Sequence, residues 1–148
     1  MHTQYHISTD PALIDLDLVH RFLSQESYWA RQIPISVVKR AIEHSLCFGV
    51  YANKAQVGFA RVVTDYATFA YLADVFIIPE HRGQGLSKEL VKTIHAHPSL
   101  QGLRRWMLMT LDAHRLYESY GWERVPDALA DRVMQRHDPD VYTRQAGE

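Results

Sequence analysis

The chain has 148 residues, of which 47% are hydrophobic and 22% are charged, and its formal net charge at pH 7 is −1. This composition excludes a disordered chain and predicts one globular domain over residues 1–148 with a core of its own. Because a net charge so close to zero gives no general attraction to polyanions, we expect neither nucleic acid nor a membrane as a partner.

The chain begins with a predicted strand and a predicted helix. Residues 4–8 alternate in polarity enough to form a strand. Thr9 or Asp10 can then cap a helix whose first position suits Pro11, and a broad apolar face continues through Ser24.

The segment 25–33 breaks this helical periodicity and contains two adjacent aromatic residues, Tyr28 and Trp29. Pro34 then opens a second predicted helix, which ends near Ser45. The two rings fit either of two roles, packing over the core or forming a wall of a small-ligand pocket, because amphipathic rings bind small ligands well. The residues alone leave both interpretations open.

Three apolar runs follow and predict consecutive antiparallel strands at 46–52, 55–64 and 69–78. The two-residue turn Asn53-Lys54 joins the first two strands into a predicted β-hairpin. The third strand leads into a helix that crosses over the sheet. This order predicts an α/β (α+β) fold, with a mixed, mostly antiparallel sheet and helices on both of its faces.

A basic loop with two glycines follows the third strand, which Pro79 ends because proline cannot continue a strand ladder. A helix comes next, and its apolar face consists of Leu86, Leu90, Val91 and Ile94. This arrangement points backbone N–H groups and the positive end of the helix dipole at one spot, which suits a phosphate or pyrophosphate. Gly83 and Gly85 allow a positive φ, and Arg82 can add a charge-assisted contact. The glycine spacing is neither that of a Walker loop nor that of a Rossmann loop.

The last third of the chain predicts two more strands and a short helix. Residues 103–110 predict a strand, and residues 113–119 predict a helix that Asp112 caps. Gly121 then suits the C-terminal cap of this helix, and residues 130–136 alternate enough to form a last strand.

Cys47 is the single cysteine, so no internal disulfide can form, which fits a reducing compartment. No apolar run reaches the ~18 residues of a membrane-spanning helix, and the N-terminus lacks a signal-peptide pattern, so we expect a soluble, cytoplasmic protein. The nine histidines are scattered, and the pair His95 and His97 would lie on different faces of a helix. We therefore expect no metal site.

Two stretches resemble sequence signatures of the GCN5-related N-acetyltransferases, the GNAT superfamily. Residues 82–87, RGQGLS, resemble motif A, R/Q-x-x-G-x-G/A, with Ser87 in place of the closing Gly or Ala. Residues 113–122, AHRLYESYGW, resemble the signature A-x-x-L/F-Y-x-x-x-G-F, with Trp122 in place of Phe. The resemblance covers residues 46–122 well and the two ends of the chain only by topology.

The resemblance implies a GNAT fold of six to seven strands, acetyl-CoA as the co-substrate, and a small-molecule or peptide primary amine as the acceptor. A homodimer is compatible with it. In the family the glycine loop holds the coenzyme pyrophosphate, and the preceding strand binds the pantetheine arm. The implied coenzyme-binding residues lie on that strand, in the glycine loop and at two later positions: Phe76, Ile77, Ile78, Arg82, Gly83, Gln84, Gly85, Leu86, Ser87, Thr110 and Tyr117. Thr110 stands where many members carry a coenzyme-contacting asparagine.

The resemblance also implies catalytic roles. Tyr117 stands at the position of the general acid that protonates the leaving thiolate, and Tyr120 is the alternative if the register differs. A backbone N–H near Phe76 or Ile77 would polarise the thioester carbonyl.

Asp74 is the one carboxylate within the third apolar strand, where an unpaired buried charge would be costly. It could take the proton of the amine, orient the ammonium group, or serve as a structural partner of a loop N–H or an arginine. With the resemblance, we expect Asp74, Tyr28 and Trp29 to contact the acceptor.

Two other functions compete with acetyl transfer to a small amine. A non-catalytic acyl-CoA-binding or regulatory module would keep the glycine loop without the acceptor chemistry. Tyr117, at the position of the general acid, argues against such a module. Thr110, in place of the coenzyme-contacting asparagine, leaves it open. A toxin that acetylates charged tRNA would need a basic groove. The chain has only two adjacent basic pairs, Lys39-Arg40 and Arg104-Arg105, which disfavours the toxin.

Overall fold

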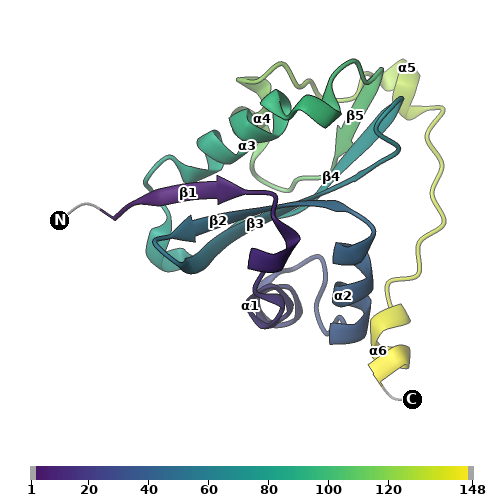
Figure 1. Ribbon diagram of the computed structural model, residues 1–148. Helices are drawn as coiled ribbons and strands as arrows, with labels where there is room; N and C mark the ends of the chain where they lie inside the picture. Colours follow the sequence, from purple (N-terminus) through teal and green to yellow (C-terminus); the bar gives the residue numbers. More distant parts are fainter. Residues whose placement is uncertain (1–2, 147–148) are drawn as a thin grey trace.

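One mixed sheet forms the centre of the molecule. In the computed structural model, which describes residues 3–146, five strands pair in the order β1-β2-β3-β4-β5 (Figure 1). Their bounds are β1 Tyr5–Ser8, β2 Leu46–Ala52, β3 Ala55–Thr64, β4 Phe69–Ile77 and β5 Arg105–Leu108. The first four pair antiparallel and β4 pairs parallel with β5. The predicted mixed, mostly antiparallel sheet is confirmed, with five strands in the described residues in place of six to seven.

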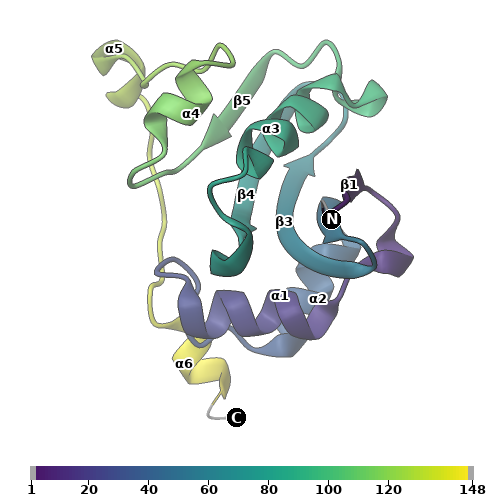
Figure 2. The same ribbon diagram turned by 90° about the vertical axis from the view of Figure 1, so that its left-hand side faces the viewer.

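Helices cover both faces of this sheet, as predicted (Figures 1 and 2). The helices α1 (Leu16–Arg21) and α2 (Ile35–Glu43) lie on one face, whereas α3 (Leu86–Ala96) and α4 (His114–Glu118) lie on the other. Each face has its own buried cluster of apolar side chains. The cluster under α1 and α2 includes Val19, Phe22, Leu23, Val38, Phe59 and Phe76, and the cluster under α3 includes Phe48, Val62, Leu72, Leu90, Ile94 and Tyr117.

The predicted first helix is divided into two parts. Asp10 caps a short 3-10 turn at Pro11–Leu13, where its side chain accepts from the Ala12 N–H. The chain then extends at Ile14, and Asp15 caps α1 by accepting from the Leu18 N–H at 3.1 Å. A single helix was expected because the apolar face is continuous, but an aspartate side chain satisfies free N–H groups and so starts a new helix.

The predicted cap of the short helix near the C-terminal signature is wrong. The residue before α4 is Ala113, and its N–H donates to the side-chain oxygen of Thr110 at 3.0 Å. Thr110 therefore accepts the N–H at the start of α4, the capping role that was predicted for Asp112. The predicted role of Gly121 holds: its φ is +89°, and the following N–H of Trp122 returns to the carbonyl of Tyr117.

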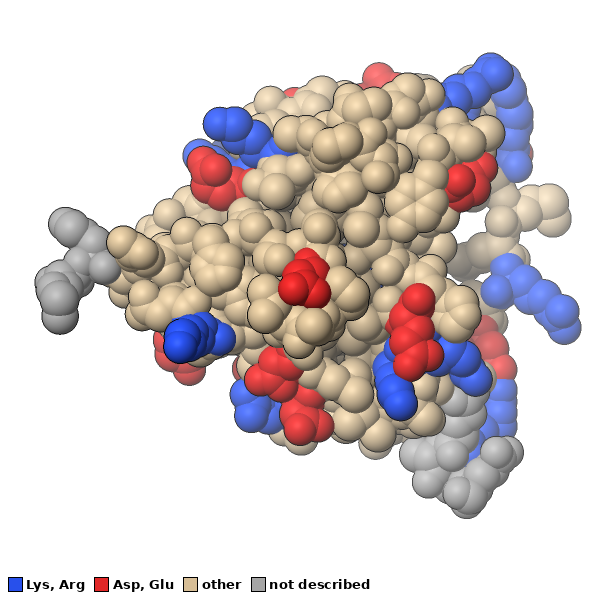
Figure 3. All heavy atoms as spheres, viewed as in Figure 1, with Lys and Arg blue, Asp and Glu red and all other residues tan. Residues whose placement is uncertain are grey.

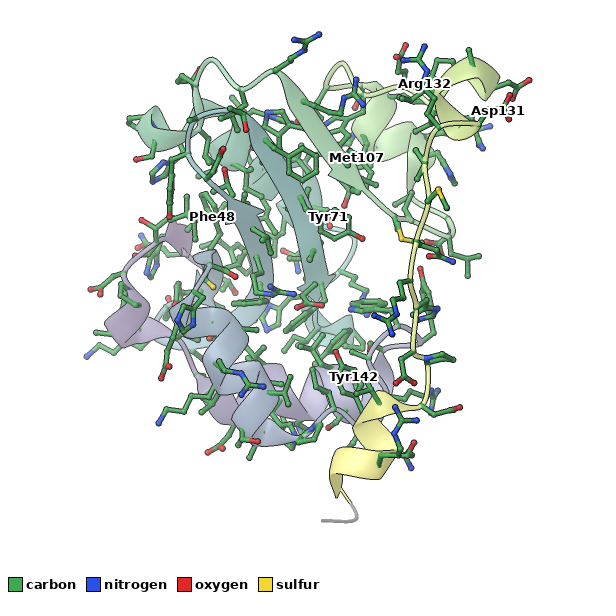
Figure 4. The ribbon with its side chains drawn as sticks, turned by 90° about the vertical axis from the view of Figure 1, so that its right-hand side faces the viewer. Phe48, Tyr71, Met107, Asp131, Arg132 and Tyr142 are labelled. Carbon is green, nitrogen blue, oxygen red and sulfur yellow. The ribbon has the colours of Figure 1, made fainter. Side chains whose placement is uncertain are left out.

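The expected last strand at 130–136 is also wrong. Helix α5 (Asp127–Ala130) occupies its start, and residues 131–140 run exposed along the surface to α6 (Val141–Ala146), where Tyr142 packs against the α1–α2 cluster (Figure 4). A period-2 pattern gives a strand only where a neighbouring strand edge is within reach. Here residues 120–129 face β5 across a hollow of about 480 Å³, so residues 131–140 have no strand to pair with in the described part of the chain.

On the face shown in Figure 3, lysine and arginine side chains and aspartate and glutamate side chains are scattered among uncharged residues. None of the helices in the described residues is long and apolar enough to span a membrane.

Candidate active site

The site begins where β4 and β5 separate. Parallel pairing joins only residues 69–72 of β4 to residues 105–108 of β5, and beyond this point β4 continues to Ile77 with no strand of residues 3–146 on that side (Figure 4). The Ile78 N–H donates to the Val57 carbonyl on β3 at 2.9 Å. Because successive residues of a strand direct their backbone groups to opposite sides, the N–H of Ile77 points to the open edge and that of Phe76 points to β3. Of the two predicted N–H donors, strand geometry therefore favours Ile77.

A β-bulge helps to separate the two strands. Arg61 of β3 is paired with Ala73, but Phe59 is paired with Phe76, so two residues of β4, Asp74 and Val75, lie opposite one residue of β3. Asp74 has a φ of +56°, which is uncommon for a residue other than glycine. Bulges bend a strand and re-aim its side chains, and they are frequent beside active sites.

The glycine loop lies at the end of the open edge. Gly83 and Gly85 have φ values of +79° and +78°, and a Cβ atom added to either would meet nothing within 4 Å. The positive φ values explain why glycine occupies both positions, since a Cβ atom at either position would meet no other atom within 4 Å. A hollow of about 270 Å³ lies between this loop, the first turn of α3 and Leu116. The unpaired N–H groups of that turn and the helix dipole favour an anion there.

Other predicted coenzyme residues lie around this hollow. Arg82 donates from Nε to the Ile77 carbonyl at 2.8 Å, which leaves its terminal guanidinium nitrogens available. Ser87 lines the hollow, and Leu86 also reaches it while packing into the α3 cluster. Gln84 is exposed to solvent. The hydroxyl of Thr110 accepts a hydrogen bond from the Ala113 N–H.

Tyr117 and Tyr120 have different environments. Tyr117 is buried in the α3 cluster, and burial, with a smaller contribution from the phenol of Tyr28, raises the pKa of Tyr117 to about 12. Tyr120 donates its hydroxyl to the Lys88 carbonyl at 3.1 Å. No protein partner holds the Tyr117 hydroxyl within residues 3–146, so of the two tyrosines it is the one free to donate to a ligand.

Asp74 is held by two donors. Arg61 Nε donates to Oδ2 at 2.9 Å, and Trp29 Nε1 donates to Oδ1 at 2.9 Å. Arg61 also donates from Nη1 to the hydroxyl of Ser45 at 3.2 Å. Of the roles considered for Asp74, this geometry favours the partner of an arginine, because both carboxylate oxygens already accept from protein donors.

The two aromatic residues of the loop between α1 and α2 lie at the surface. Tyr28 is 58% exposed, and its hydroxyl accepts from the Leu111 N–H at 3.2 Å. Trp29 is 42% exposed and contacts Phe22, which stacks on Phe76 with ring centroids 3.9 Å apart. Trp29 therefore packs partly over the core through Phe22, whereas most of Tyr28 is exposed.

Within residues 3–146 no three His, Cys, Asp or Glu side chains gather closely enough to hold a metal ion. Cys47 is buried near Arg61, and burial raises the pKa of its thiol to about 12, which makes it a poor nucleophile.

The comparisons with known proteins agree on one family. Residues 43–124, more than half of the chain, match the model of the acetyltransferase (GNAT) domain. A protein of Gibberella zeae that is named as an acetyltransferase is 36% identical over 135 residues, covering 76% of this chain and 75% of that protein. The crystal structure of a GNAT-family protein of Xanthomonas campestris pv. campestris is 54% identical with a TM-score of 0.89, covering 95% of this chain and 97% of that one.

A Clostridium acetobutylicum protein whose crystal structure includes acetyl-CoA shares the fold, with 12% identity and a TM-score of 0.56 over 85% of this chain and 93% of that one. The family match covers both stretches that carry the sequence signatures, and it also covers the open edge of β4. The chain belongs to the GNAT family of N-acetyltransferases.

Proposed function

We propose that this protein is a single-domain enzyme that transfers an acetyl group from acetyl-CoA to a primary amine of a small molecule or peptide. The observation that carries the proposal is the unpaired edge of β4 running into the glycine loop at the start of α3. An extended amide-bearing arm can add to a free strand edge, and its pyrophosphate can sit on free N–H groups of a helix N-terminus.

The residues divide into binding and catalytic groups. Backbone N–H groups of residues 83–87 and the terminal nitrogens of Arg82 would hold the pyrophosphate, and the Ile77 N–H at the open edge would donate to the thioester carbonyl at the end of the pantetheine arm. As the amine nitrogen bonds to the acyl carbon and the C–S bond breaks, Tyr117 donates its hydroxyl proton to the sulfur; the nitrogen loses one proton to solvent, and solvent returns a proton to the phenol. Its raised pKa keeps this phenol protonated at neutral pH.

We assign Asp74 as a positioning residue. It fixes Trp29 beside the bulge of β4, and its charge is compensated by Arg61. The ammonium form of the acceptor, with a pKa of ~10, then loses its proton to solvent before attack.

Coenzyme binding can be tested by thermal unfolding. Acetyl-CoA at about a hundred times its dissociation constant should stabilise the protein by about 2.7 kcal/mol, which raises the melting temperature by about 5–10 °C. NAD and ATP should raise it far less, because they lack the pantetheine arm. Equal shifts with ATP and acetyl-CoA would mean that the loop recognises phosphate alone.

Turnover requires a second assay, in which thiol release from acetyl-CoA is measured against amines, amino acids, aminoglycosides and peptides. Release with one acceptor class supports the proposal and identifies the acceptor. Coenzyme binding without release across the whole panel would support a non-catalytic acyl-CoA-binding module instead.

Arg82→Ala should weaken acetyl-CoA binding by about 1.5–3 kcal/mol, roughly 10- to 150-fold in the dissociation constant, because a charge-assisted contact to phosphate is lost. Isothermal titration calorimetry measures the change. Arg115→Ala, which removes an exposed arginine from α4, is a control with the same change of charge. Equal binding by the Arg82→Ala variant and the wild type would exclude Arg82 from the pyrophosphate site.

A further inference from the structure

Two adjacent residues of the loop between α1 and α2 are attached to opposite sides of the opening between β4 and β5. Trp29 donates to Asp74, which lies on β4, at 2.9 Å. Tyr28 accepts from the N–H of Leu111, which follows β5, at 3.2 Å. Both contacts lie beyond the last paired residues of the two strands, so Tyr28 and Trp29 span the opening. We refer to these two residues as the aromatic bridge.

The loop that carries the aromatic bridge is held firmly in place. The side chain of Ser27 is buried; its hydroxyl donates to the Leu23 carbonyl at 2.7 Å and accepts from the Ala30 N–H at 3.1 Å. The Gln32 N–H donates to the Ser24 carbonyl at 3.1 Å. With its base and both aromatic residues bonded, the loop forms a wall of fixed position.

The aromatic bridge lies across the sheet from the proposed general acid. Tyr117 packs with the α3 cluster on one face, whereas Tyr28 and Trp29 belong to the face of α1 and α2. A thioester that lies along the open edge of β4 with its sulfur at Tyr117 would direct its acyl group into the opening that the aromatic bridge spans.

We propose that the aromatic bridge limits the length of the acyl group, so that acetyl-CoA is accepted and longer acyl-CoA thioesters are rejected. This inference rests on the proposed function. A longer chain would have to displace the two rings or break their bonds to Asp74 and Leu111, and the buried Ser27 hydroxyl opposes movement of the loop at its base. A fixed apolar wall is expected to discriminate on the order of tenfold or more against a thioester whose acyl chain does not fit.

The test measures the dissociation constants of CoA, acetyl-CoA, butyryl-CoA and octanoyl-CoA by calorimetry, which requires no acceptor. We expect the wild type to bind octanoyl-CoA at least about tenfold more weakly than acetyl-CoA. Tyr28→Ala should reduce this ratio to about threefold or less, because the ring that blocks the chain is gone. Tyr28→Phe keeps the ring and loses only the bond to Leu111, so it should keep most of the discrimination.

Tyr66→Ala is the matched control, since Tyr66 is a tyrosine of the β3–β4 turn with 51% exposure and should leave the ratio unchanged. Equal binding of octanoyl-CoA and acetyl-CoA by the wild type would overturn the inference, whatever the variants do. An unchanged ratio in a folded Tyr28→Ala variant would also overturn it. Absence of binding by CoA and by all three thioesters would instead contradict the proposed function itself.

Discussion

Replacing Tyr117 by phenylalanine is expected to lower turnover about a hundredfold or more while the dissociation constant of acetyl-CoA stays within about twofold of the wild-type value. The ring remains in the α3 cluster, so packing is kept and only the proton donor is lost. Steady-state kinetics of thiol release and calorimetry of coenzyme binding separate the two effects.

The matched control is Tyr120→Phe, which also removes one hydroxyl. Because that hydroxyl is bonded to the Lys88 carbonyl, its loss should cost about 1 kcal/mol of stability and leave turnover within a few-fold of wild type. The reverse pattern, with turnover kept in Tyr117→Phe and lost in Tyr120→Phe, would move the catalytic role to Tyr120.

The pH dependence of the wild type provides a further check on Tyr117. With its pKa raised to about 12, the phenol stays protonated through the usual assay range, so turnover should show no fall from its ionisation below about pH 10. Its contribution to stability is complete below the unfolded-state pKa of ~10 and is lost as the pH rises toward 12. A fall in turnover near pH 8–9 that disappears in Tyr117→Phe would contradict this environment.

Asp74→Asn is expected to lower the free energy of unfolding by about 1–3 kcal/mol, or the melting temperature by about 3–10 °C. The variant leaves the guanidinium of Arg61 partly buried without its counter-charge, while an acceptor for Trp29 remains. Asparagine tolerates the positive φ at this position, so the backbone adds little cost. Thermal and urea unfolding measure the loss.

The same variant decides whether Asp74 acts on the acceptor. A residue that only positions its neighbours leaves the shape of the pH–rate profile unchanged, and that is the expected result. A rate loss at low amine concentration that recovers as the pH approaches ~10 would show that Asp74 acts on the charge of the amine. The variant Arg61→Leu/Asp74→Asn, which removes both charges, should be more stable than the sum of the single changes predicts.

The parts of this molecule that follow from the sequence are those that short segments determine. Glycines at 83 and 85 are required by local backbone conformation, and both have the predicted positive φ. The Asn53-Lys54 turn joins β2 and β3 as expected, because flanking apolar runs and turn length fix a hairpin. These features depend on neighbours in the chain, so the order of residues reveals them.

The parts that were missed depend on contacts between distant residues. Asp74 stood out as an acid in an apolar strand, but its bond to Trp29 joins residues 45 positions apart, and nothing in either segment indicates the other. Arg61 is not among the residues predicted for the site, although the sequence contains a signal for its contact with Asp74. The short β3–β4 connection pairs Arg61 with Ala73, beside Asp74, so the hairpin register alone could have suggested the ion pair.

The exposed segment 131–140 has a consequence for how the gene can change over evolutionary time. It buries almost nothing between its two helices, so insertions or deletions there cost little more than loop closure, about 0.6 kcal/mol for each doubling of length. The stretch from Ile77 to Gly83 has no such freedom, because one added residue would shift the glycine loop by roughly 3 Å from the open edge. Insertions and deletions among descendants of this chain should therefore accumulate in segment 131–140, and selection should remove those that fall between Ile77 and Gly83.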